Sequence, residues 1–345
     1  MTRGGRAPVL GAGGLLLAVA ATVALGSGAA AIPLGRVARI LGASTGLDPG
    51  DGIPAWERLV VLDVRLPRIV TGSLVGGGLA VAGAALQALL RNPLADPGVL
   101  GVASGGALGA VLALHLGLAA LTTWAVPGLA ILGAAAATFA VYAIAARRGA
   151  LPAGTLLLAG VAVGSLASAL TSLVLSFTLE EYEQGRQVFR WLMGGLEART
   201  WADVALVTPT TLLGSAALLA SSRELDALLL GEVHALSVGV DVGRVRRRLL
   251  GATSLVVGGA VAVSGVLAFV GLLVPHVVRA LLGPSHARLL PACLVNGAAL
   301  VVVADLACRL LRAPEELRLG VMTAGLGAPF FLWLLVARRR DEEGA

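Results

Sequence analysis

Long apolar runs separated by short polar loops dominate this chain of 345 residues. A helix that crosses a bilayer needs about 20 mostly apolar residues, and we looked for runs of that length bounded by charge or proline. Eight are clear, at residues 9–32, 69–90, 99–121, 126–146, 155–177, 204–220, 289–307 and 319–337. A further stretch, 249–282, is too long for one span and contains Ser264, Gly265 and Pro275. The pattern predicts an all-helical, multi-pass membrane protein.

The arginines predict how these spans are oriented, because positively charged loops stay on the cytoplasmic side of a membrane. Arginine clusters lie at 147–148, 244–248 and 338–340. Only an even number of spans after the second cluster returns the chain to the cytoplasm, so the stretch 249–282 should form two helices. This predicts ten spans in the cytoplasmic (inner) membrane, with both termini cytoplasmic. The first run could instead be a signal peptide, but it is longer than a normal signal core, which favours a retained helix.

A weak internal repeat relates the two halves of the chain. A shift of 182 residues places Val75-Gly76-Gly77 on Val257-Gly258-Gly259 and Pro93 on Pro275. These segments lie in spans two and seven, so the halves would point in opposite directions, as in many transporters. We therefore expect one domain over residues 1–345 with a five-helix inverted repeat, its half-repeats at approximately 60–178 and 245–337.

Composition narrows the function further. Apolar residues make up 57% of the chain and charged residues 13%, and the sequence contains no lysine. A Walker A loop needs a lysine, so any ATP-driven activity must use the ATPase of another chain. Two cysteines and four histidines are too few for a metal framework, and the arginines of this +6 chain sit between apolar runs rather than along one face. We expect no enzymatic activity, no cofactor, no metal and no nucleic-acid partner.

Three motifs stand out against this background. They are Arg65-Leu-Pro-Arg68 followed by Gln87 and Arg91-Asn-Pro-Leu-Ala-Asp-Pro-Gly-Val-Leu-Gly101; Phe189-Arg-Trp-Leu-Met-Gly-Gly-Leu196; and Phe269-Val-Gly-Leu-Leu-Val-Pro-His-Val-Val-Arg279, followed by residues 319–333. Together they resemble the FecCD-type permeases, the membrane subunits of ABC importers for ferric siderophores, haem and vitamin B12. The resemblance covers about residues 60–337. It implies a permease that pairs with a second copy of itself, an ABC ATPase and a periplasmic or lipid-anchored substrate-binding protein.

The resemblance also implies roles for particular residues. Asn92, Pro93 and Leu94 would form a cytoplasmic gate, although a plain helix stop explains them too. Arg65, Arg68 and Arg309 would receive acidic residues of the binding protein, the alternative being that they anchor the chain at the membrane interface. A cytoplasmic coupling loop at approximately 225–248 would dock on the ATPase through Gly231, Glu232, His234, Ala235, Leu236, Ser237, Val238, Gly239 and Val240. The outer loop 180–199 is amphipathic and is expected to contain a short surface helix.

The cargo and the energy source stay open at this point. A ferric siderophore is the first expectation, with vitamin B12 or haem as alternatives, because the same framework serves all three. A secondary carrier driven by an ion gradient would also fit an inverted repeat, but it needs acidic residues within the spans, and only Asp305 lies well inside one. Asp305 could equally pair with Arg309, one helical turn further on. A membrane enzyme would need polar catalytic groups within the spans, and the sequence shows none.

Overall fold

The computed structural model describes residues 6–28, 30–48, 50–98, 101–146, 153–178, 182–313 and 315–343, and in these ranges the chain is helical with no β-strand. The all-helical prediction is therefore confirmed. Arg147 and Arg148, used above to orient the spans, lie outside the described residues. The helices are α1 (Arg6–Gly26), α2 (Leu34–Ser44), α3 (Ala55–Leu59), α4 (Leu66–Leu89), α5 (Val102–His115), α6 (Ala125–Ala145), α7 (Ala153–Thr178), α8 (Tyr182–Leu192), α9 (Trp201–Ala220), α10 (Ser222–Leu229), α11 (Glu232–Ser237), α12 (Val242–Ser264), α13 (Val270–Leu282), α14 (His286–Leu311) and α15 (Leu319–Glu343).

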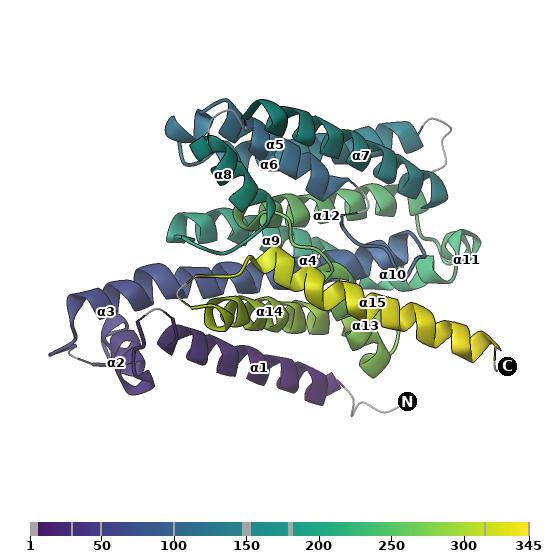
Figure 1. The fold of residues 1–345 in the computed structure, drawn as a ribbon. Coiled ribbons are helices and arrows are strands. Elements are labelled where there is room, and N and C mark those ends of the chain that lie inside the picture. Colours follow the sequence, from purple (N-terminus) through teal and green to yellow (C-terminus); the bar gives the residue numbers. More distant parts are fainter. Residues whose placement is uncertain are drawn as a thin grey trace.

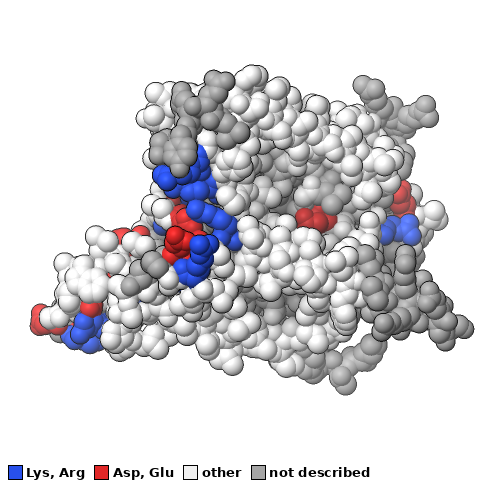
Figure 2. All heavy atoms as spheres, in the orientation of Figure 1, with Lys and Arg blue, Asp and Glu red and all other residues white. Residues whose placement is uncertain are grey.

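The long helices lie roughly side by side and give the molecule two distinct ends (Figure 1). One end carries α10, α11, the start of α1 and the end of α15, and is called the α11 end below. The opposite end carries α2, α3 and α8, and is called the α8 end. Charged side chains on the face in Figure 2 gather towards these two ends, and the wide band between them is uncharged apart from acidic atoms in a hollow. A band of this kind suits a protein surrounded by lipid.

Within the described residues, six helical segments are long and apolar enough to cross a membrane: Pro8–Gly26, Ala55–Leu89 (α3 and α4 joined by a π-helix at Val60–Arg65), Ala125–Ala145, Gly154–Thr178, Trp201–Ala220 and His286–Leu311. Three shorter helices, Val102–His115, Val270–Leu282 and Leu319–Leu334, are also apolar. The total of ten spans stays a prediction, because helix length and composition alone assign fewer.

Helix α4 forms the centre of the molecule and is buried along almost its whole length. It packs against α9, α12, α13 and α14. Small residues make this packing possible: a Cβ atom on Gly76 would overlap the carbonyl oxygen of Gly297 in α14, and one on Gly83 would overlap that of Gly271 in α13. Backbones that approach this closely are typical of helix contacts in lipid, where small residues replace bulky ones at the interface.

The long stretch 249–282 forms two helices, as the arginine pattern predicted. Helix α12 ends at Ser264 and α13 begins at Val270. Gly265 lies between them with φ 65°, and Phe269 adopts the left-handed conformation at φ 66°. The break therefore occurs at Gly265, the residue type that adopts this conformation without steric cost.

Helix α5 is shorter than the sequence led us to expect. The run 99–121 predicted a full span, but the regular helix covers only Val102–His115. It begins after Gly101, which has φ 73°, so α5 and α13 share a short length and a left-handed residue before their first turn. Apolarity is uniform along 99–121, and hydropathy alone therefore cannot locate the ends of the helix.

Candidate functional site

The cytoplasmic loop predicted to couple to an ATPase folds into two short helices, α10 and α11, at one end of the molecule (Figure 1). Helix α11 exposes apolar side chains: Val233 is 84% exposed, Leu236 61%, and Val238, just beyond the helix, 57%. Ala235 is buried on the opposite side. Large apolar side chains grouped on an exposed short helix mark a surface that contacts another molecule.

Ion pairs hold this segment against α12. Glu232 accepts from Arg246 at 2.5 Å, and Glu224 accepts from Arg248 at 2.7 Å. Asp241 caps α12 by accepting the backbone N–H of Arg244 at 2.9 Å, and this hydrogen bond lowers the pKa of the Asp241 carboxyl. The apolar surface of α11 is thus fixed to the first turns of a long helix. Arg246 and Arg248 are therefore engaged within the chain.

The predicted gate residues form a turn directly after α4. The side-chain oxygen of Asn92 accepts the backbone N–H of Leu94 at 2.9 Å, and Pro93 and Leu94 are exposed. Arg91 precedes them in the left-handed conformation, with φ 49°. The structure therefore shows a helix end followed by a tight turn, which agrees with the interpretation of these residues as a plain helix stop. Their role as a gate stays a prediction.

The two loops that precede the short helices α5 and α13 meet in the interior. Asp96 and Pro97, from the first loop, line a small cavity of about 70 Å³ together with Val266–Ala268, from the second. Asp96 accepts the backbone N–H of Gly98 at 2.8 Å, and the rest of the cavity lining is largely apolar. Irregular backbone at this depth is tolerated in a membrane protein only inside the protein or along a water-filled path.

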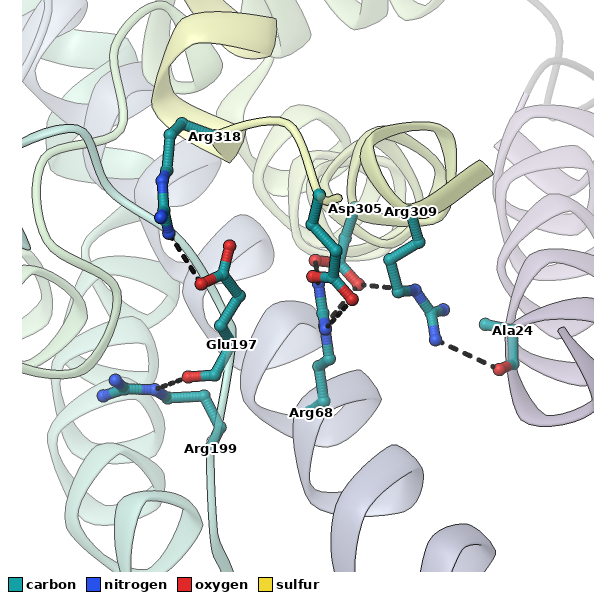
Figure 3. A network of polar contacts seen from close by, with 8 residues as sticks. Ala24, Arg68, Glu197, Arg199, Asp305, Arg309 and Arg318 are labelled. Atoms are coloured by element: carbon teal, nitrogen blue, oxygen red, sulfur yellow. Dashed lines mark hydrogen bonds and ion pairs between the residues drawn. The ribbon is translucent and has the colours of Figure 1, made fainter. Parts of the chain in front are cut away.

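Arg68, one of three arginines predicted to dock a binding protein, is instead held between two carboxylates (Figure 3). It donates to Asp305 at 2.8 and 2.9 Å and to Glu316 at 2.7 and 3.1 Å, so its guanidinium is bidentate on both sides. Arg309 lies 3.5 Å from Asp305, which is the local pairing considered for that acid. These contacts join α4, α14 and the loop before α15 at the α8 end.

Arg65 and Arg309 also close the end of α1. Arg65 donates to the carbonyl oxygen of Leu25 at 2.6 Å and to that of Ala30, while Arg309 donates to Ala24 at 3.3 Å. The last carbonyls of a helix lack helical partners and attract positive charge, so two arginines here stabilise the end of α1.

The three arginines predicted to dock a binding protein are buried in this structure. Arg65, Arg68 and Arg309 are only 5%, 8% and 6% exposed. Their contribution to docking stays a prediction, and it would act through the shape that they give to the α8 end.

The loop predicted to lie on the outer side contains the expected short helix, α8, which borders a larger cavity. This cavity has a volume of about 410 Å³ and is lined by charged residues of α8 and of the loops near α9 and α15, among them Arg190, Arg199, Arg318, Glu197 and Asp203. Arg318 donates to Glu197 at 2.6 Å, and Arg199 donates to the carbonyl oxygen of Glu197 (Figure 3). Arg190 is exposed.

Several interactions of the site were not predicted from the sequence, and two of them involve residues that the sequence did not single out. Glu316 completes the coordination of Arg68, and Asp226 of α10 bonds to His286 at the start of α14. Their partners are far apart in the chain, and no spacing rule connects them. In the part of the chain that the structure describes, no group of three or more His, Cys, Asp or Glu residues is placed to hold a metal ion.

Comparison with known proteins gives a consistent result. The FecCD transport family matches residues 16–337. The chain is 45% identical over 292 residues to the cobalamin import system permease protein BtuC of Halobacterium salinarum, covering 85% of this chain and 76% of that protein. It is 41% identical to the vitamin B12 import system permease protein BtuC of Vibrio parahaemolyticus, covering 84% of this chain and 86% of that protein.

Two further relatives extend the comparison over nearly the whole chain. The uncharacterized ABC transporter permease protein YvrB of Bacillus subtilis is 38% identical to this chain, and the alignment covers 94% of this chain and 92% of that protein. A solved structure of a metal-chelate type ABC transporter in an inward-facing conformation superposes with a TM-score of 0.83 at 31% identity, covering 96% of this chain and 99% of that one. The chain belongs to the FecCD transport family of ABC transporter permeases.

Proposed function

We propose that this chain is the permease subunit of an ATP-driven importer in the cytoplasmic membrane, with both termini in the cytoplasm. The family match over residues 16–337 carries this proposal. The chain contains no lysine, so a Walker A ATPase must be contributed by a separate subunit. Ten spans, arranged as two inverted halves, would enclose the transport pathway.

The ATPase would dock on α11 and the turn that follows it. Val233, Leu236 and Val238 offer an exposed apolar surface, and the ion pairs of Glu224 and Glu232 fix that surface to α12. A rigidly held surface transmits the movement of a bound partner to the helices behind it. We therefore assign the coupling role to the segment from Gly231 to Val240.

Asp305, the one acidic residue well inside a span predicted from the sequence, does not suit a carrier driven by an ion gradient. Such a carrier needs an acidic residue that can bind and release a proton or cation within the membrane. Asp305 accepts hydrogen bonds from Arg68 at 2.8, 2.9 and 3.1 Å and lies beside Arg309. A carboxylate fixed between two guanidinium groups is poorly suited to that cycle.

For the cargo we propose a cobalamin-type corrinoid in place of the ferric siderophore expected from the sequence. The relatives at 45% and 41% identity are both named as cobalamin or vitamin B12 permeases. The motifs in the sequence did not separate the three cargoes, so this choice rests on overall similarity. A ferric siderophore is the alternative that the experiment below distinguishes.

The remaining partners would be a second copy of the chain and a substrate-binding protein. Helices α7 and α15 expose large apolar side chains, including Leu166, Leu170, Leu326 and Trp333, and a second copy could cover such a surface. The binding protein would dock at the α8 end. There Arg65, Arg68 and Arg309 support the surface from within, and the exposed Arg190 borders the outer cavity.

Co-purification of the tagged chain from its native membrane tests this proposal. We expect an ABC ATPase and a binding protein in the purified complex, and cobalt rather than iron in the ligand of that binding protein. Iron would overturn the proposed cargo but not the importer. A chain recovered without an ATPase, and whose transport survives ATP depletion, would overturn the importer itself.

A further inference from the structure

The N-terminus of α14 is capped by a side chain from another helix, α10. Its N-cap residue, Ser285, makes no side-chain capping bond. Instead Asp226 of α10 accepts the backbone N–H of His286 at 2.8 Å. The first N–H groups of a helix lack helical acceptors and attract negative charge, so Asp226 caps α14 from another helix.

The same carboxylate fixes the side chain of His286. The ring Nδ1 lies 2.6 Å from Asp226 Oδ1, and Ser285 Oγ lies 3.4 Å from the other oxygen, Oδ2. A carboxylate only accepts hydrogen bonds, so Nδ1 is the protonated ring nitrogen that donates. The His286 side chain is completely buried, whereas that of Asp226 is 38% exposed. A buried ring bonded in this way keeps α10 and the start of α14 in register.

Helix α10 directly precedes the coupling segment, Gly231 to Val240, and lies mostly within the predicted coupling loop 225–248. It contacts α11, α14 and α4, and Glu224 in the same helix pairs with Arg248 of α12. A Cβ atom placed on Gly231, at the junction of α10 and α11, would lie 3.9 Å from the guanidinium of Arg91, the residue before the predicted gate. Asp226 therefore lies on the helix directly before α11, which carries the surface proposed to dock the ATPase.

Helix α14 connects this point to the opposite end of the molecule. Its 26 residues correspond to about 39 Å at the ordinary helical rise. It packs along α4, and near its far end Asp305 is bonded to Arg68. Helix α14 is therefore hydrogen-bonded to Asp226 of α10 at its start and to Arg68, at the α8 end, near its last turns.

We propose that Asp226 is a positioning residue that attaches α14 to the coupling segment, so that movement imposed on α11 shifts α14 and alters the α8 end. This inference rests on the proposed importer function. Helix α14 contains Pro291 five residues after His286 but is continuous to Leu311, so a displacement of its first turn is carried to the contacts near its far end. In this proposal the Asp226–His286 pair transmits the movement of α10 and α11 to α14.

The test uses the assembled importer in proteoliposomes and measures both ATP hydrolysis and cargo transported. Asp226→Ala should lower the cargo moved per ATP by about fivefold or more, the lower range of ordinary coupling energies. Asp226→Asn keeps a side-chain acceptor for the His286 N–H and should restore part of that ratio. The matched control is Arg223→Ala, which removes an exposed side chain from the same helix and should leave the ratio unchanged. An unchanged ratio in assembled Asp226→Ala would overturn the proposal.

A second measurement needs no change at the pair itself. Spin labels at Arg223→Cys and Pro284→Cys, both exposed positions next to the joint, report the separation of α10 from the start of α14. We expect the same separation in the nucleotide-free and ATP-trapped importer, because the two elements move together. A shift of about 5 Å, one helical turn, would show that they move independently and would overturn the proposal. If the parent complex lacks an ATPase or does not transport, the proposed function fails instead.

Discussion

At the scale of single residues, the Arg68 cluster shows how charge is accommodated at the α8 end. A buried guanidinium is costly unless its charge is paired and hydrogen-bonded, and Arg68 is paired with both Asp305 and Glu316. The sequence indicated the contact between Asp305 and Arg309, because four residues separate them on one helix. It could not indicate the contact with Arg68, whose partner lies 237 positions away.

Removing Arg68 tests the role of this cluster. Arg68→Ala leaves Asp305 buried beside a single remaining arginine, and we expect a loss of about 3–5 kcal/mol of stability, as for other broken buried pairs. The midpoint of thermal unfolding in detergent measures this loss. The double variant Arg68→Ala/Asp305→Ala should recover much of it, because no unpaired carboxylate remains at that position. If the single variant is as stable as the parent chain, the cluster does not stabilise the fold.

At the scale of elements, the helix breaks show what a sequence pattern can and cannot locate. The distribution of the arginine clusters required two helices in 249–282, but the sequence offered Ser264, Gly265 and Pro275 without deciding between them, and the structure places the break at Gly265. The shortening of α5 was not predictable, since residues 99–121 are apolar on both sides of its ends. Helix ends in such a run depend on packing against other helices rather than on local composition.

Gly265 allows a test of the break between α12 and α13. A Cβ atom there would overlap the carbonyl oxygen of Trp191, and the residue has φ 65°, so Gly265→Ala should lose at least about 1–2 kcal/mol from backbone strain alone. The matched control is Gly251→Ala in α12, where the new methyl group meets no atom within 4 Å. That control should be neutral or slightly stabilising, because alanine is a better helix former. Equal unfolding midpoints for the two variants would contradict this account of the break.

The exposed surface of α11 has its own prediction. Leu236→Asp places a charge on the apolar surface proposed to dock the ATPase and should reduce hydrolysis stimulated by the binding protein, without altering the fold, because Leu236 is 61% exposed. Leu47→Asp, at an exposed position of the α8 end, is the control with the same chemical change. Normal stimulation in Leu236→Asp would place the coupling contact elsewhere.

At the scale of the whole molecule, sequence and structure agree on an all-helical membrane protein of the FecCD family and differ on how its charged residues are used. The apolar runs and joint motifs were sufficient for the fold and family, because both depend on patterns along the chain. The arginine cluster and the Asp226–His286 pair depend on residues brought together by folding. The motifs singled out Arg65, Arg68 and Arg309 for docking, but did not indicate that their side chains are buried.

The energy source of transport tests the central claim most directly. The chain would be reconstituted in proteoliposomes with its ATPase and binding protein, and uptake of cobalamin measured with ATP inside the vesicles and with ionophores that remove proton and sodium gradients. We predict uptake that requires ATP and both partner proteins and that persists when the gradients are removed. Uptake by the permease alone that collapses with the gradient and continues without ATP would contradict the account.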